Sequence, residues 1–178
     1  MTTRTRSNAT TRRRTYQGPM KARKPPSERK RRDDPEGREQ AKLIEWAAWL
    51  KIPEADDIEP GAKIADYLHA IPNGELRHHA TAGRLKAQGV KGGVSDLQLP
   101  IARRGYIGLW LEMKAPSRRP KKPGAATGES DDQIAWGQRM QRAGHYYAVA
   151  YTMHEAAGII AWYLGLPATG LQGERIIQ

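Results

Sequence analysis

The chain has 178 residues, which is enough for one domain with a single hydrophobic core and too few for two large ones. It contains no cysteine, and this excludes disulfide bonds, cysteine nucleophiles, zinc fingers and iron–sulfur clusters. The longest apolar run, 158–165, is far shorter than the roughly 20 residues of a membrane span. The polar, basic start does not resemble a signal peptide, so we expect a cytoplasmic protein without a membrane partner.

Positive charge is concentrated near the start of the chain. Residues 1–37 hold 12 Lys and Arg against 4 Asp and Glu, and they contain no Val, Ile, Leu, Phe or Trp. Such a segment cannot bury enough apolar surface to offset its ordering entropy. We therefore predict a disordered basic arm over 1–37, a folded domain over 38–166 and a C-terminal tail over 167–178. The arm favours a polyanionic partner such as nucleic acid, with a solubilising or targeting role as the alternative.

The first predicted helix opens at acidic capping residues. Asp33 and Asp34 precede Pro35, a residue type favoured at the first helical position, and the helix is expected to run to about residue 50. Its apolar stripe comprises Leu43, Trp46, Ala47 and Leu50. Counting back four residues from Leu43 reaches Glu39, so this carboxylate is predicted on the face that meets the core. The alternative for Glu39 is a first-turn acid favoured by the helix dipole.

The middle of the chain changes from helical to strand periodicity. A second helix is expected over about 60–69, followed by a turn at 71–74, and a short third helix over 80–88. From residue 94 the apolar residues alternate, which predicts strands over 94–99 and 106–114. These two strands are close enough in sequence to form a hairpin.

The last third of the chain predicts one more helix–strand–helix unit. It begins after a loop over 115–129 that is rich in Pro, Gly, Arg and Lys and too polar to pack. A Ser-x-x-Gln capping box then opens a helix over 130–143, a strand follows over 145–151, and a second capping box opens the final helix over 152–164. This order of helices and strands predicts an α/β fold with one central sheet flanked by helices.

Two carboxylates and a lysine occupy the two strands of the predicted hairpin. Asp96 lies in the first strand, and Glu112 and Lys114, two residues apart, share one face of the second. Burying such charges is costly unless they pair or bind a cation. One interpretation is a magnesium site in which the lysine orients a water for attack on phosphorus, with Glu39 as a third acid. The other is an ion pair at a strand end. Gln133 fits either such a site or a purely capping role.

These residues resemble the PD-(D/E)-x-K nucleases and, more narrowly, the VRR-NUC domain, the virus-type replication-repair nuclease domain. The signature is Asp96 followed by Glu112-Met-Lys114. Further stretches with this resemblance are Glu39-Gln40 ahead of a Trp-containing helix, Ile71-Pro-Asn-Gly74, 82–97, 111–116 and Gln133 ahead of Trp136. The resemblance covers about residues 38–165. One departure is Ser95, where the family usually has proline, at a position that supplies no ligand.

The resemblance implies a restriction-endonuclease-like PD-(D/E)xK core, which is an α/β fold with a single central mixed sheet flanked by helices. It also implies hydrolysis of DNA phosphodiester bonds with Mg²⁺ or Mn²⁺ as cofactor. The residues that match the metal ligands are Glu39, Asp96, Glu112 and the main-chain carbonyl of Met113. Lys114 matches the residue that orients the attacking water, and Gln133 matches the glutamine that follows the core motif.

Basic side chains of the hairpin turn and the polar loop are the expected DNA contacts. They are Arg103, Arg104, Arg118, Arg119, Lys121 and Lys122, with a solvated surface as the alternative. We expect a structure-selective endonuclease for branched or junction DNA in virus- or phage-type replication and repair, in the host cytoplasm if the source is viral. Analogy with junction resolvases suggests a homodimer. The alternatives are a restriction-type or exonucleolytic nuclease of the same fold, and a non-catalytic DNA-binding protein.

Overall fold

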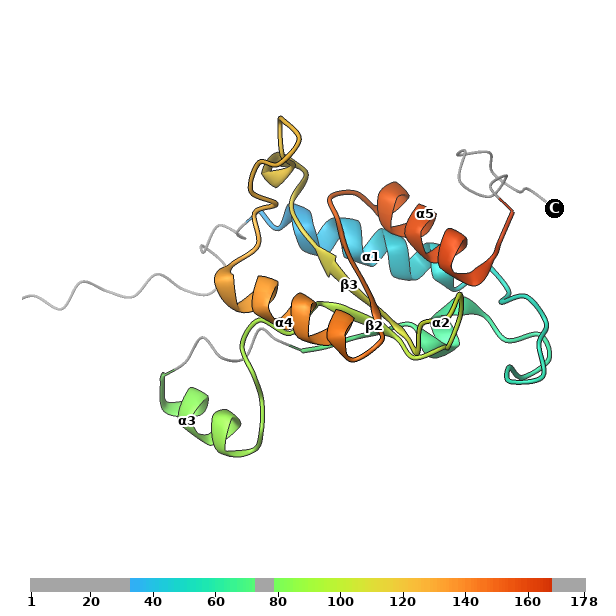
Figure 1. The fold of residues 1–178 in the computed structure, drawn as a ribbon, viewed down its shortest axis with the longest axis horizontal. Coiled ribbons are helices and arrows are strands. Elements are labelled where there is room, and N and C mark those ends of the chain that lie inside the picture. Colours follow the sequence, from blue (N-terminus) through green and yellow to red (C-terminus); the bar gives the residue numbers. More distant parts are fainter. Residues whose placement is uncertain (1–32, 73–78, 168–178) are drawn as a thin grey trace, which may run out of the picture. The chain divides into compact units, whose positions relative to one another are not determined.

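The computed structural model describes residues 33–72 and 79–167. Its elements (Figure 1) are, in chain order, α1 (Pro35–Ala47), α2 (Ile64–Tyr67), β1 (His69–Ala70), α3 (His79–Ala87), β2 (Leu97–Leu99), β3 (Leu109–Met113), the 3-10 helix η3 (Pro116–Arg118), α4 (Asp131–Arg142), β4 (Tyr146–Ala150) and α5 (Met153–Leu164). None of the helices in these two ranges has the length and apolar character that crossing a membrane requires. Residues 1–32 of the predicted basic arm lie outside the described residues, whereas residues 35–37 form the first turn of α1, so the helical domain begins earlier than the predicted boundary at 38.

The four strands form one mixed sheet in the order β1-β2-β3-β4. Strands β1, β2 and β3 pair antiparallel, whereas β4 pairs parallel with β3. The parallel pair is joined by a long crossover that contains α4, because parallel neighbours cannot be linked by a tight turn. The fold class that the sequence predicted, a single central mixed sheet with flanking helices, is confirmed.

Alternate residues of β3 and β4 face two different helical layers. Leu111 and its register partner Ala148 belong to the hydrophobic core that α1 and α5 complete, and Leu43 and Ile160 are fully buried there. On the other face, the neighbouring register pair of Trp110 and Tyr147 meets α4. Since both faces are covered, all five residues of β3 are buried, and a charged residue placed on this strand becomes a buried charge.

Capping residues in the sequence correctly predict where α1 starts, whereas strand pairing shortens the expected second helix. Asp34 caps α1 by accepting a hydrogen bond from Gly37 N at 2.9 Å, as its sequence context predicts. The helix expected over about 60–69 is shortened to α2, because His69 and Ala70 pair with β2 to form β1. A strand of two residues has no periodicity that a sequence can show, so β1 was not predicted.

The contact between α4 and β4 leaves no room for a side chain at Gly137. A Cβ atom there would lie 2.6 Å from Cε1 of the Tyr147 ring. We therefore expect Gly137→Ala to destabilise the fold by about 1–3 kcal/mol, because the ring must be displaced. Gly83→Ala in α3 is the matched control, since nothing lies within 4 Å of its Cβ position. Urea unfolding of both variants checks this, and a Gly137→Ala protein as stable as the Gly83→Ala protein contradicts it.

Candidate active site

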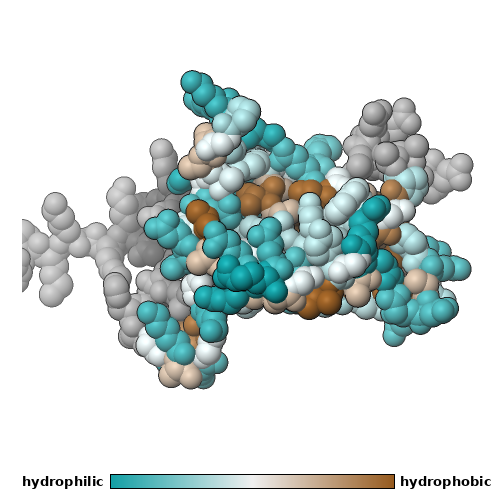
Figure 2. Space-filling view, viewed as in Figure 1, coloured by the Kyte–Doolittle hydropathy of each residue, from teal (hydrophilic) through white to brown (hydrophobic). Residues whose placement is uncertain are grey.

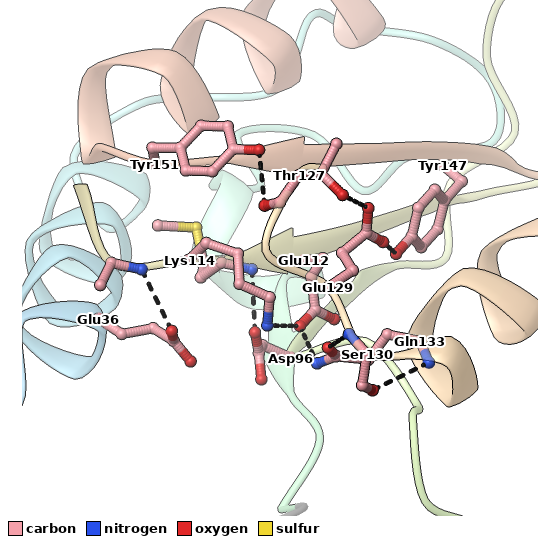
Figure 3. Close-up of polar contacts among 12 residues, drawn as sticks. Glu36, Asp96, Glu112, Lys114, Thr127, Glu129, Ser130, Gln133, Tyr147 and Tyr151 are labelled. Carbon is pink, nitrogen blue, oxygen red and sulfur yellow. Dashed lines mark hydrogen bonds and ion pairs between the residues drawn. The ribbon is translucent and has the colours of Figure 1, made fainter. Parts of the chain in front are cut away.

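Asp96 and Lys114 meet because the hairpin of β2 and β3 brings the start of one strand beside the end of the other (Figure 3). Asp96 immediately precedes β2, and its Oδ2 accepts a hydrogen bond from the main-chain N of Met113 at 2.9 Å. Glu112 lies in β3, and Lys114 follows directly after the strand. The structure thus brings together the three charged residues of the predicted signature.

Glu112 is the centre of the cluster and is fully buried. Its Oε1 accepts from Nζ of Lys114 at 2.5 Å and also from the side-chain amide of Gln133, in the first turn of α4. Its Oε2 is buried and has no hydrogen-bond partner. Burial raises the pKa of Glu112 to about 8, and the nearby charge of Asp96 acts in the same direction. Oε1 of Glu112 therefore accepts two hydrogen bonds, while Oε2 accepts none from the described residues.

Gln133 combines the two roles that the sequence left open. Its Oε1 accepts from the main-chain N of Ser130 at 2.9 Å, which closes the capping box of α4. Its amide nitrogen donates to Glu112. The capping contact fixes the direction of the side chain, so the amide nitrogen faces the buried carboxylate (Figure 3).

The acid of α1 that lies beside this cluster is Glu36, which corrects the prediction of Glu39. Oε2 of Glu36 accepts from the main-chain N of Ala115 at 3.2 Å. Burial raises the pKa of Glu36, Asp96 raises it further, and the charge of Lys114 opposes the shift. Side chains seven positions apart on a helix point within about 20° of each other, and side chains four positions apart point within about 40°. Counting back seven positions from the buried Leu43 identifies Glu36, whereas counting back four identifies Glu39.

Glu39 is used elsewhere in the fold. One of its oxygens pairs with Nζ of Lys42 at 2.7 Å, and the other accepts from the main-chain N of Met153 at 2.8 Å, at the first residue of α5. Both oxygens are thus engaged, one within α1 and the other in joining α1 to α5. The structure does not bring Glu39 into the cluster with Asp96 and Glu112.

The donor set suits a hard divalent cation. Burial raises the pKa of Asp96 as well as that of Glu112, so two carboxylates are crowded in a site of low polarity. Across residues 33–72 and 79–167, no group of three or more Asp, Glu or His side chains is gathered closely enough to hold a metal ion. However, Mg²⁺ needs only one or two protein carboxylates and keeps several waters. The unpartnered Oε2 of Glu112 and the carboxylate of Asp96 fit that requirement.

A cleft of about 520 Å³ opens beside Lys114. Its lining includes Asp34, Glu36, Lys114, Arg118, Glu129 and Gln133. Arg118 is thus the one predicted DNA contact that lines this cleft, from the start of the polar loop. The loop forms a hydrophilic projection at the top of the face shown in Figure 2, and Lys121 and Lys122 are exposed on it. Arg119 pairs with Glu155 at 2.5 Å.

Arg103 and Arg104 do not join the site. They lie in the turn between β2 and β3, at the opposite end of the hairpin from Asp96 and Glu112. Arg103 forms two hydrogen bonds to Asp57, at 2.7 and 3.0 Å, and Arg104 donates to the main-chain O of Trp162 at 2.6 Å. These contacts tie the turn to its neighbours and place both arginines away from the cluster, and their role as DNA contacts stays a prediction.

Two residues of the site were not predicted. Glu129 lines the cleft, and Oη of Tyr147 in β4 donates to it at 2.5 Å. Glu129 directly precedes the capping box of α4, which is the one signal in the sequence that places it near Gln133. Tyr147 lies in the half-buried strand β4 and carries no such signal.

The comparisons with known proteins support the fold. No protein-family model matches the sequence, and no curated protein sequence matches it. The structure is similar to a solved chain described as a VRR_NUC domain protein, with 24% identity and a TM-score of 0.57, over 75% of this chain and 91% of that one. This similarity shows the fold, an α/β domain with one mixed sheet flanked by helices. The predicted resemblance to the VRR-NUC domain is confirmed at the level of the fold.

Proposed function

We propose that this protein is a metal-dependent nuclease that hydrolyses phosphodiester bonds of DNA. The observation that carries the proposal is the cluster of Asp96, Glu112 and Lys114, which places buried carboxylates and an ammonium group together beside a cleft in a VRR_NUC-type fold. Carboxylates facing phosphate only weaken binding unless a cation lies between them. The cluster therefore favours an enzyme over a non-catalytic DNA-binding protein.

The cation that we propose is Mg²⁺ or Mn²⁺, held by Asp96 and Glu112, with the main-chain carbonyl of Met113 implied by the resemblance. Glu36 takes the place of Glu39 as the acid supplied by the first helix. When bound, such an ion activates water and neutralises charge on the phosphate. The orphaned Oε2 of Glu112 supports this assignment, because a buried carboxyl oxygen without a partner is costly and a bound cation would supply the partner.

The chain's own residues prepare the site. Lys114 and Gln133 both donate to Oε1 of Glu112, which leaves Oε2 as the free ligand oxygen. The main-chain N of Met113 orients Asp96 in the same way. The ammonium of Lys114 is then the donor that orients a water for attack on phosphorus and stabilises the developing charge. These fixed contacts orient each group before substrate binds.

The substrate that we propose is DNA with a branch or junction. Arg118 at the cleft and Lys121 and Lys122 on the projecting loop would contact backbone phosphates, as would the basic arm. Three further parts of the proposal rest on the resemblance to VRR-NUC proteins. They are selectivity for branched structures, a role in phage-type replication and repair, and a homodimeric state. A panel of labelled flaps, forks, four-way junctions and linear duplexes tests the substrate. Equal cleavage of linear and branched DNA favours the restriction-type or exonucleolytic alternative.

Metal affinity is expected to depend on pH. Because the pKa of Glu112 is raised to about 8, the metal-free site binds a proton below that pH, and the ion must displace it. The affinity for Mg²⁺ should therefore rise about tenfold per pH unit up to about 8 and level off above it. Calorimetric titration of the protein without DNA measures this. An affinity that is constant between about pH 6 and about pH 9 contradicts the participation of Glu112.

A further inference from the structure

Glu129 lines the cleft, and each of its carboxylate oxygens accepts a hydrogen bond. Its Oε1 accepts from Oη of Tyr147 at 2.5 Å, and its Oε2 accepts from Oγ1 of Thr127 at 2.5 Å (Figure 3). We call these contacts the Tyr147–Glu129–Thr127 clasp. Since both oxygens are occupied, the carboxylate acts as a bridge that fastens the end of the polar loop to strand β4.

The tyrosine end of the clasp is fixed in place. The Tyr147 ring packs directly against Gly137 of α4, where even a Cβ atom would collide with it. Burial raises the pKa of Tyr147 above its usual range, and the hydrogen bond to Glu129 raises it further. The Tyr147 hydroxyl therefore stays protonated and can donate its hydrogen bond to Glu129 from strand β4.

The clasp is connected to the carboxylate of Glu112 through Ser130 and Gln133. Glu129 is followed by Ser130, whose main-chain N donates to Oε1 of Gln133 at 2.9 Å, while its Oγ accepts from the main-chain N of Gln133 at 3.4 Å. The amide nitrogen of Gln133 donates to Glu112. A continuous series of contacts thus runs from Tyr147 through Glu129, Ser130 and Gln133 to Glu112.

A second group of contacts closes the base of the loop. Oη of Tyr151 donates to the main-chain O of Thr127 at 2.9 Å. Gly128 has a φ of +80°, and a Cβ atom there would lie 3.0 Å from Cβ of Arg118, so this turn requires glycine. The loop was predicted to be too polar to pack, yet its two ends are held together. The clasp therefore fixes the end of the loop that precedes Ser130 and Gln133.

We propose that Glu129 is a positioning residue, and that the Tyr147–Glu129–Thr127 clasp holds Ser130 so that Gln133 keeps Glu112 oriented for catalysis. This inference rests on the proposed function of the same site. It assigns to Glu129 a role in geometry and none in binding the cation. Its loss should lower kcat, since a small displacement of a catalytic group is costly in rate, and it should leave KM nearly unchanged.

Two substitutions at Glu129 separate position from charge. Glu129→Ala removes both contacts. Glu129→Gln keeps the shape, because its carbonyl oxygen accepts from Tyr147 and its amide donates to the Thr127 hydroxyl, but it removes the charge. We expect kcat to fall about tenfold or more in Glu129→Ala and to stay within about twofold of the wild type in Glu129→Gln. Wild-type kcat in Glu129→Ala, or an equal loss in both variants, overturns the proposal.

Hydrogen exchange gives a readout that does not depend on cleavage. The peptide 128–136 should exchange faster in Glu129→Ala than in the wild type and in Glu129→Gln, because the clasp no longer holds the start of α4. Unchanged exchange in Glu129→Ala overturns the clasp even if the wild type proves to cleave no DNA, in which case the proposed function alone has failed. If Glu129→Ala does not fold, Tyr147→Phe removes one hydroxyl and should lower kcat and protection in the same direction, and wild-type values there overturn the proposal.

Discussion

Lys114→Ala is expected to reduce DNA cleavage by about 10²- to 10⁴-fold, because the substitution removes the group that orients and polarises the attacking water. Lys114 is buried, and its ammonium lies 2.5 Å from Glu112. Binding of Mg²⁺ should persist, since the ion itself compensates the charge of Glu112 when the lysine is absent. The measurement is single-turnover cleavage of a labelled DNA substrate, together with calorimetric titration of the metal.

The loss must be separated from unfolding, because breaking a buried ion pair destabilises a protein. Circular dichroism melts in the presence of Mg²⁺ show whether the variant is folded under the assay conditions. Lys114→Arg provides a second variant, which keeps a cation beside Glu112 but changes its shape and its hydrogen-bonding geometry. It is expected to be folded and still strongly impaired. Full cleavage by a folded Lys114→Ala protein contradicts the role that we propose for the lysine.

Glu36→Gln and Glu39→Gln are expected to have opposite outcomes although both residues lie in α1. Glu36 lines the cleft and interacts electrostatically with Asp96 and Lys114, so its neutralisation should weaken metal binding and lower cleavage about tenfold or more. Glu39 pairs with Lys42 and with the start of α5. Its substitution should therefore lower the melting temperature slightly and leave cleavage of the folded protein unchanged.

The matched pair tests the geometry of the site directly. The two substitutions are chemically identical and three residues apart on one helix, so general effects of lost charge are the same for both. Cleavage rates and Mg²⁺ affinities are measured for each variant side by side. If Glu39→Gln is the impaired variant and Glu36→Gln is not, the arrangement described for α1 is incorrect.

Local chemistry in the sequence was sufficient for the hairpin and for the residues that it carries. Asp96, Glu112 and Lys114 could be placed together because strand alternation and hairpin pairing are regular. Gln133 could be placed because a capping box marks the start of a helix. In each case the position of the side chain follows from a few neighbouring residues.

Features that depend on long-range contacts could not be predicted in this way. The choice between Glu36 and Glu39 depends on how α1 packs against the sheet and α5, and a small difference in helical angle decides it. The partners of Arg103 and Arg104, Asp57 and the Trp162 carbonyl, lie far away in sequence. The contact of Glu129 with Tyr147 depends on how the polar loop folds back onto β4.

The most direct test of the account is cleavage of labelled branched DNA by the wild-type protein and by Asp96→Asn, each with Mg²⁺ and with EDTA. Asp96 is the residue to change because it is held by the main-chain N of Met113, whereas Lys114 and Glu112 are hydrogen-bonded to each other. We predict cleavage by the wild type only when Mg²⁺ is present, and none by Asp96→Asn under either condition. Cleavage by Asp96→Asn at the wild-type rate, or wild-type cleavage that persists in EDTA, would contradict a metal-dependent nuclease centre at this cluster.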